Sequence, residues 1–127
     1  MMKFLHSMIR VKDEEKSIKF YCELLGLKKG KSIRLEDCKL QYLTDEKTGV
    51  DIELTVNDEI PENGYTVGNA FGHFAFEAEN LDETGKKMAE MGYKWEVEPF
   101  YMPEVKTRIS FLLDPDGNSI ELIEARA

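Results

Sequence analysis

The chain has 127 residues, which is enough for one domain with a buried core and too few for two unrelated domains. Its 17 Lys and Arg residues against 25 Asp and Glu residues give a formal net charge of −8, which argues against binding to the phosphate backbone of nucleic acids. No stretch approaches the roughly 18 consecutive apolar residues of a membrane span. We therefore expect a protein that binds neither nucleic acid nor membrane.

The N-terminal residues are not expected to form a secretory signal, because His6, Ser7 and Arg10 interrupt the apolar run. A cytoplasmic protein is therefore expected. Cys22 and Cys38 are too few for a disulfide scaffold and lack the spacing of a metal-binding cluster. We expect both to be packing residues.

The first half of the chain predicts a strand, a helix and three further strands. Residues 3–11 alternate apolar and polar side chains, as strands do, and Asp13 can cap a helix that Gly26 ends. Four residues at helical spacing are expected to form its apolar face: Ile18, Tyr21, Cys22 and Leu25. Strand-like runs follow at residues 31–35, 39–44 and 50–56.

Residues 58–69 contain a proline, two glycines and several polar residues, and are interpreted as a connector. The same order then begins again. Residues 71–78 alternate like a strand, Asn80 or Asp82 can cap a helix, and Gly92 can end it. Strand-like runs follow at residues 93–97, 107–113 and 119–123, with an Asp-Pro-Asp-Gly turn before the last.

Both halves thus predict the order βαβββ, and their residues match. His6 aligns with His73 at an offset of 67, and the tripeptide Ile-Glu-Leu at residues 52–54 recurs at 120–122 at an offset of 68. We therefore interpret the chain as one α+β domain of two modules, residues 1–57 and 70–125, joined by the connector 58–69.

The chemistry is expected at the only two histidines and two matching glutamates. Glu53 follows His6 by 47 residues, and Glu121 follows His73 by 48. Taken singly, a strand histidine is more often a hydrogen-bonded core residue, and a strand glutamate usually faces solvent. Repeated at matching positions, they predict one divalent metal with two nitrogen, two oxygen and two water ligands. These donors suit Ni²⁺, Co²⁺, Zn²⁺ or Fe²⁺ and leave the identity of the metal open; we expect Ni²⁺ or Co²⁺, with Zn²⁺ possible.

Four stretches resemble glyoxalase I (lactoylglutathione lyase) of the vicinal oxygen chelate superfamily, in its short bacterial form. They are LHSMIRVKDEEKSIKFYCELLGL at the start, IELTVN at 52–57, FGHFAF at 71–76 and DPDGNSIELIE at 114–124. The resemblance implies two tandem βαβββ modules whose curved mixed sheets enclose the metal site. It also implies isomerisation of the hemithioacetal of methylglyoxal and glutathione to S-lactoylglutathione, through a metal-stabilised enediolate. The expected role is methylglyoxal detoxification.

The resemblance further assigns roles to single residues. Glu121 matches the base that moves the substrate proton, and Glu53 matches its partner across the metal. Arg10 and Asn57 match positions that hold the γ-glutamyl end of glutathione. After Trp95 the chain departs from the family's glycine-containing segment, and we interpret residues 99–103 as an aromatic loop bordering the pocket. Lys106 or Arg108 is then expected to meet the glycyl carboxylate of glutathione. The expected co-substrate is glutathione or another low-molecular-weight thiol.

The resemblance leaves the assembly and the exact reaction open. Members of the family build the site within one chain or across a dimer interface, and we expect a homodimer. Two alternatives to glyoxalase I are another enzyme of the superfamily, such as a thioester epimerase or a thiol transferase, and a non-catalytic module that binds a drug or a metal. The complete set of four ligands argues against the non-catalytic module.

Overall fold

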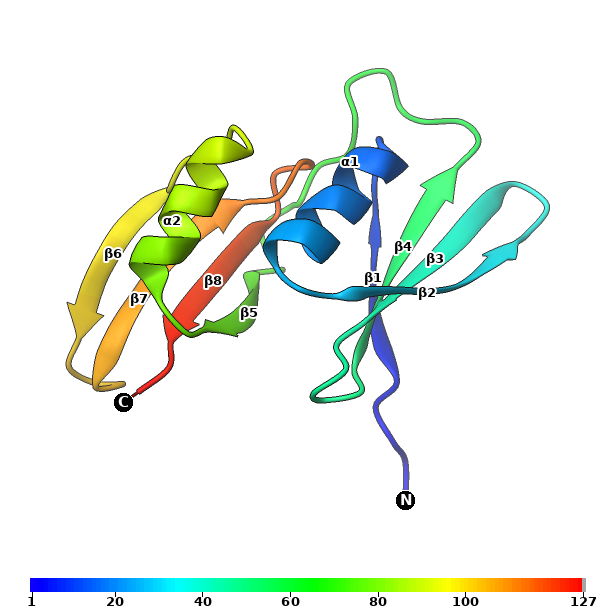
Figure 1. The fold of residues 1–127 in the computed structure, drawn as a ribbon. Helices are drawn as coiled ribbons and strands as arrows, with labels where there is room; N and C mark the ends of the chain where they lie inside the picture. Colours follow the sequence, from blue (N-terminus) through cyan, green and yellow to red (C-terminus); the bar gives the residue numbers. More distant parts are fainter. Residues whose placement is uncertain (127) are drawn as a thin grey trace. The chain divides into compact units, whose positions relative to one another are not determined.

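The computed structural model describes residues 1–126, which form two compact units: unit 1 (Met1–Thr66) and unit 2 (Val67–Ala127, of which residue 127 lies outside the description). Figure 1 shows the chain coloured along its sequence. Each unit contains one four-stranded sheet and one helical segment, in the order strand, helix and three strands. The predicted α+β fold with two βαβββ modules is confirmed.

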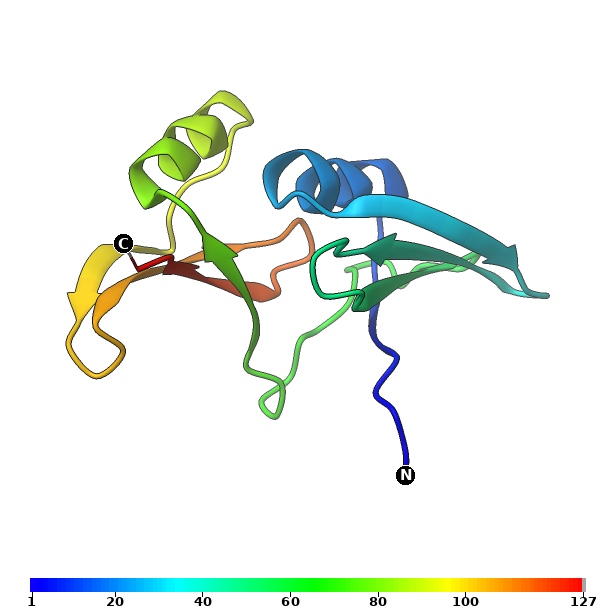
Figure 2. The ribbon, with the colours of Figure 1, turned by 60° about the horizontal axis from the view of Figure 1, so that its bottom comes forward.

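In unit 1 the spatial order of strands is β1-β4-β3-β2. These strands are β1 (His6–Arg10), β2 (Lys28–Arg34), β3 (Cys38–Thr44) and β4 (Asp51–Asn57). The first strand pairs with the last in parallel, and the other neighbours are antiparallel. The segment between β1 and β2 forms α1 (Glu14–Lys19) and a π-helical turn, η1 (Phe20–Leu24), on one face of the sheet (Figure 2).

Unit 2 repeats this topology with the order β5-β8-β7-β6. Its elements are β5 (His73–Ala78), α2 (Leu81–Glu90), β6 (Val97–Met102), β7 (Thr107–Leu113) and β8 (Ser119–Glu124). Again the first and last strands of the module are parallel neighbours. This pairing brings the histidine strand and the glutamate strand of each module side by side.

The predicted helix boundaries are confirmed. Asp13 accepts a hydrogen bond from the backbone N–H of Lys16, and Asn80 rather than Asp82 caps α2. Gly26 and Gly92 follow the helices at φ values of 85° and 86°, a conformation that costs glycine little. Among the described residues, no helix is long and apolar enough to span a membrane.

The buried face of the first helical segment is rotated from the prediction by one residue. The fully or nearly buried residues are Ser17, Phe20, Tyr21 and Leu24, and the predicted Ile18 and Leu25 are only partly buried. The spacing i, i+3, i+4, i+7 was therefore right, but its starting residue was wrong. Ser17 is small and polar, so hydropathy alone did not mark it as a buried position. Cys22 and Cys38 are free and partly buried.

The predicted strand at residues 93–97 is wrong, because the strand is β6 at Val97–Met102. It lies at the edge of its sheet, where the missing N–H of Pro99 costs no ladder hydrogen bond. The register against β7 shifts between Val97 and Phe100, which accommodates the proline. The segment interpreted as an aromatic loop is thus largely an edge strand.

The core of each unit lies between its helix and one face of its sheet. In unit 1 it is built on Phe20, Tyr21, Leu43, Ile52 and Leu54, and in unit 2 on Leu81, Met88, Leu112, Ile120 and Leu122. Each such side chain contributes roughly 1.5–3 kcal/mol when fully buried. Since neighbouring strand residues point to opposite faces, the glutamates between these core residues project from the face away from the helix.

Candidate active site

In unit 1 the parallel pairing of β1 with β4 places the imidazole of His6 against the carboxylate of Glu53. The distance from His6 Nε2 to Glu53 Oε2 is 2.9 Å. Ile52 and Leu54 flank Glu53 in sequence and are buried on the opposite face. The carboxylate itself is also buried, with 10% of the side chain exposed. A buried carboxylate requires polar or positive partners, and the histidine is one of them.

In unit 2 the same construction brings His73 to Glu121. The distance from His73 Nε2 to Glu121 Oε1 is 3.3 Å, and 17% of the glutamate side chain is exposed. Ile120 and Leu122 point to the helix side and are buried. Each module therefore supplies one imidazole nitrogen and one carboxylate oxygen at equivalent places.

Glu53 has two further polar neighbours on the same face. The Thr55 hydroxyl donates to Glu53 Oε1 at 3.2 Å. Tyr42 lies directly across from Glu53 on β3, and the interaction of its hydroxyl with that carboxylate, followed by burial, raises the pKa of Tyr42 above its ordinary value. The Tyr42 ring also meets the His6 ring edge-on, at 5.4 Å between centroids.

Tyr42 and Thr55 were not identified from the sequence. Alternation of strand side chains places Thr55 on the face of Glu53, because the two residues are two positions apart, but it does not show that Thr55 bonds the carboxylate. The position of Tyr42 depends on the register between β3 and β4, which the sequence does not fix.

A family model described as "Glyoxalase/Bleomycin resistance protein/Dioxygenase superfamily" matches residues 3–122. The chain belongs to this family. A probable lactoylglutathione lyase of Synechocystis sp. is 35% identical over 125 residues, which are 97% of this chain and 95% of the relative. A lactoylglutathione lyase of Salmonella typhimurium is also 35% identical, over 98% of this chain and 94% of the relative.

Solved structures of glyoxalase I show the same fold. Glyoxalase I from Zea mays is 31% identical with a TM-score of 0.84, and the match covers 97% of this chain. This chain spans only 44% of the maize chain. Glyoxalase I from Leishmania major is 32% identical with a TM-score of 0.77, covering 98% of this chain and 87% of that one.

The donors in this glyoxalase-family chain fit a divalent metal in kind. Imidazole nitrogen and carboxylate oxygen, without thiolate, suit Ni²⁺, Co²⁺, Zn²⁺ or Fe²⁺. Each pair supplies two donors, whereas such ions take four to six. Within residues 1–126, no group of three or more His, Cys, Asp and Glu side chains is placed to hold a metal. Each pair by itself is thus half of a ligand set.

Three of the predicted substrate-binding residues lie at the following places. Arg10 ends β1 and is exposed, and its register partner on β4 is Thr55, on the face that carries Glu53. Asn57 ends β4 on that same face by alternation. Lys106 lies in the turn between β6 and β7, is exposed, and has a φ of 58°.

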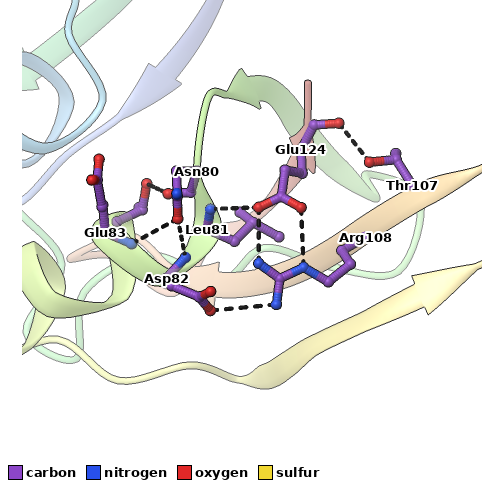
Figure 3. Close-up of polar contacts among 8 residues, drawn as sticks. Asn80, Leu81, Asp82, Glu83, Thr107, Arg108 and Glu124 are labelled. Atoms are coloured by element: carbon purple, nitrogen blue, oxygen red, sulfur yellow. Dashed lines mark hydrogen bonds and ion pairs between the residues drawn. The ribbon is translucent and has the colours of Figure 1, made fainter. Parts of the chain in front are cut away.

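Arg108 does not have the surroundings expected of a substrate-binding residue (Figure 3). It lies across from Glu124 on the face of the sheet that α2 covers, opposite to the face of Phe111 and Glu121. Its guanidinium donates twice to Glu124, at 3.0 and 2.9 Å, and once to Asp82, at 3.3 Å. These bonds strongly raise the pKa of Arg108. We therefore assign Arg108 to packing and leave it out of the function proposed below.

Proposed function

We propose that this chain is a glyoxalase I, which converts the hemithioacetal of methylglyoxal and glutathione into S-lactoylglutathione. The observation that carries the proposal is the pair of equivalent His–Glu contacts, 2.9 Å in unit 1 and 3.3 Å in unit 2. The bacterial relatives named lactoylglutathione lyase, which match this chain over nearly its whole length, support the same activity. A cytoplasmic homodimer is part of the proposal.

His6, Glu53, His73 and Glu121 would hold one divalent ion, Ni²⁺ or Co²⁺ in preference to Zn²⁺. The two pairs would come together either within one chain or from the two chains of a dimer. When bound, the ion supplies electrophilic stabilisation of the negative charge that develops on the substrate oxygens.

Glu121 would move the proton in this reaction. Its carboxylate takes the proton from the carbon that carries oxygen and sulfur, and returns it to the neighbouring carbon. The hydroxyl proton passes from one substrate oxygen to the other, so no oxidant or reductant is needed. Glu53 would act as the partner of Glu121 across the site.

The glutathione part of the substrate carries two carboxylates that require cationic or amide partners. Arg10 offers a planar guanidinium, which can grip a carboxylate through two parallel hydrogen bonds. Asn57, on the same face, would hold the γ-glutamyl end together with Arg10. Lys106 would meet the glycyl carboxylate.

An assay on metal-reconstituted protein tests the function. Methylglyoxal and glutathione are mixed with protein loaded with Ni²⁺, Co²⁺ or Zn²⁺, and formation of the thioester is followed by its ultraviolet absorbance. We expect turnover with Ni²⁺ or Co²⁺. The absence of thioester with all three ions would refute the proposal and favour another reaction of the superfamily. Metal analysis of protein purified without added ions would identify the resident metal.

Glu121→Gln tests the base. The amide oxygen can still bind a metal but cannot accept a proton, so turnover should fall by about 10²–10⁴-fold while metal stays bound. Glu79→Gln, at an exposed position after β5, is the matched control and should keep parent activity. A fully active Glu121→Gln variant would show that another group moves the proton.

A further inference from the structure

The two glutamates occupy equivalent positions but have different neighbours. Each has one residue directly across from it on the adjacent antiparallel strand and one residue two positions along its own strand, on the same face. In unit 1 the neighbour across the strand pair is Tyr42 and the neighbour along the strand is Thr55. In unit 2 the equivalent neighbours are Phe111 and Ile123. Unit 1 thus presents two hydroxyls to its glutamate, and unit 2 presents none at the same positions.

The hydroxyls of unit 1 are held in place. Thr55 is 5% exposed and donates to Glu53 Oε1 at 3.2 Å. The Tyr42 ring contacts the His6 ring edge-on, and the Lys31 ammonium lies 4.9 Å from the centre of the Tyr42 ring. The Tyr42 ring is thus held directly across from Glu53, and the Thr55 hydroxyl bonds the carboxylate from along the same strand.

The contact in unit 2 is looser. Glu121 meets His73 at 3.3 Å, compared with 2.9 Å for the pair in unit 1, and Glu121 is the more exposed of the two glutamates. Phe111 meets the His73 ring edge-on at 5.7 Å, as Tyr42 meets His6, but it has no group that can bond the carboxylate. The ring contact of unit 1 is therefore repeated in unit 2, but the Phe111 ring carries no hydroxyl.

We propose that Tyr42 and Thr55 are positioning residues that hold Glu53 as a fixed ligand. Glu121, which has no such donors, keeps the freedom to leave its partner and carry a proton. The two halves of a duplicated site thereby take different roles through two hydroxyls. This inference rests on the proposed function, because it concerns the same four ligands. Its physical basis is that groups bonded to a ligand set its orientation, and their loss typically costs 10–100-fold in metal affinity or activity.

The test measures binding of Co²⁺ alone, with no thiol or methylglyoxal present. Tyr42→Phe and Thr55→Val each remove one hydroxyl with little change of volume. We expect the Kd for Co²⁺, from competition with a chelator, to rise about 10-fold in each, and the visible absorption of bound Co²⁺ to change. Thr55→Ser restores a hydroxyl and should return both readouts to within about twofold of the parent.

Tyr65→Phe is the matched control for Tyr42. Within residues 1–126 the buried Tyr65 hydroxyl has no hydrogen-bond partner, so its removal should leave Co²⁺ binding unchanged. Parent-like Kd and spectrum in both Tyr42→Phe and Thr55→Val would overturn the proposal, and so would a Thr55→Ser variant as weak as Thr55→Val. If Tyr42→Phe does not fold, the two Thr55 variants decide the question.

This experiment separates the inference from the proposed function. A parent protein that binds Co²⁺ but forms no thioester would refute the glyoxalase activity, and the comparison of Co²⁺ affinities would still decide the roles of the two hydroxyls. Unchanged affinities in an active enzyme would refute the inference alone.

Discussion

Replacing Arg108 with methionine should destabilise unit 2 and leave the fold intact. Methionine keeps most of the apolar stem of arginine but removes three hydrogen bonds, two to Glu124 and one to Asp82. Glu124 also accepts the backbone N–H of Leu81 at 2.8 Å, so it joins β7 to the first turn of α2 (Figure 3). Its carboxylate would remain half-buried without its cation.

The size of the effect follows from the exposure of each partner. The Arg108 side chain is 33% exposed and the Glu124 side chain 19%, so their bidentate pair is partly shielded from water. Asp82 is 71% exposed, so its bond adds little. Hydrogen bonds to charged groups contribute about 1.5–3 kcal/mol when buried. For this partly exposed pair we expect a loss of about 2 kcal/mol in the free energy of unfolding.

Urea denaturation at pH 7, followed by circular dichroism, measures the loss. Lys86→Met, at an exposed position of α2, controls for the removal of one positive charge and should change stability by less than about 0.5 kcal/mol. If Arg108→Met costs no more than Lys86→Met, the ion pair behaves as an ordinary surface pair, and the assignment of Arg108 to packing fails. A large loss of activity without loss of stability would return Arg108 to the substrate site.

Two further outcomes concern pH and packing. The hydrogen-bonded ion pair with Arg108, and then the Leu81 N–H, lower the pKa of Glu124 in the folded protein. The Glu124 carboxylate therefore contributes its full share of the folding stability above the ordinary glutamate pKa of about 4.3. This stability is lost as the pH falls through the lower pKa of the folded protein. Glu124→Gln should therefore cost stability at pH 7 and progressively less at about pH 3, and an equal cost at both would contradict this linkage. Leu54→Ala and Leu122→Ala each empty a fully buried position, and each should lower the free energy of unfolding by about 2–5 kcal/mol in urea titrations. A loss of less than about 1 kcal/mol in the free energy of unfolding would show that the core closes around the smaller side chain.

Local signals were the part of the fold that the sequence could predict. Asp13, Asn80 and the glycines that follow both helices act through bonds to residues a few positions away, so their effect is visible in a short window. The repeat of His6 at His73 predicted the shared topology, because matching residues at a constant offset indicate equivalent strands in the two halves.

The rest depends on partners far along the chain. Residues 99–103 were interpreted as a loop, but an edge strand tolerates Pro99, and edge positions follow from the order of strands in space. Arg108 was assigned by its charge, and its actual partner, Glu124, is 16 residues away across a strand pair. The position of Tyr42 beside Glu53 depends in the same way on the register between β3 and β4. The features that the sequence did not predict are therefore those that depend on pairing between strands far apart in the chain.

The pairing of first and last strands sets an order of assembly for each module. The antiparallel meanders β2-β3-β4 and β6-β7-β8 join neighbours in sequence and can form through short loops, whereas β1 and β5 must close loops of 47 and 48 residues to bring His6 to Glu53 and His73 to Glu121. We therefore expect the histidine strand of each module to pair after the three antiparallel strands have formed. Each module can bring its histidine to its glutamate only after its first and last strands have paired.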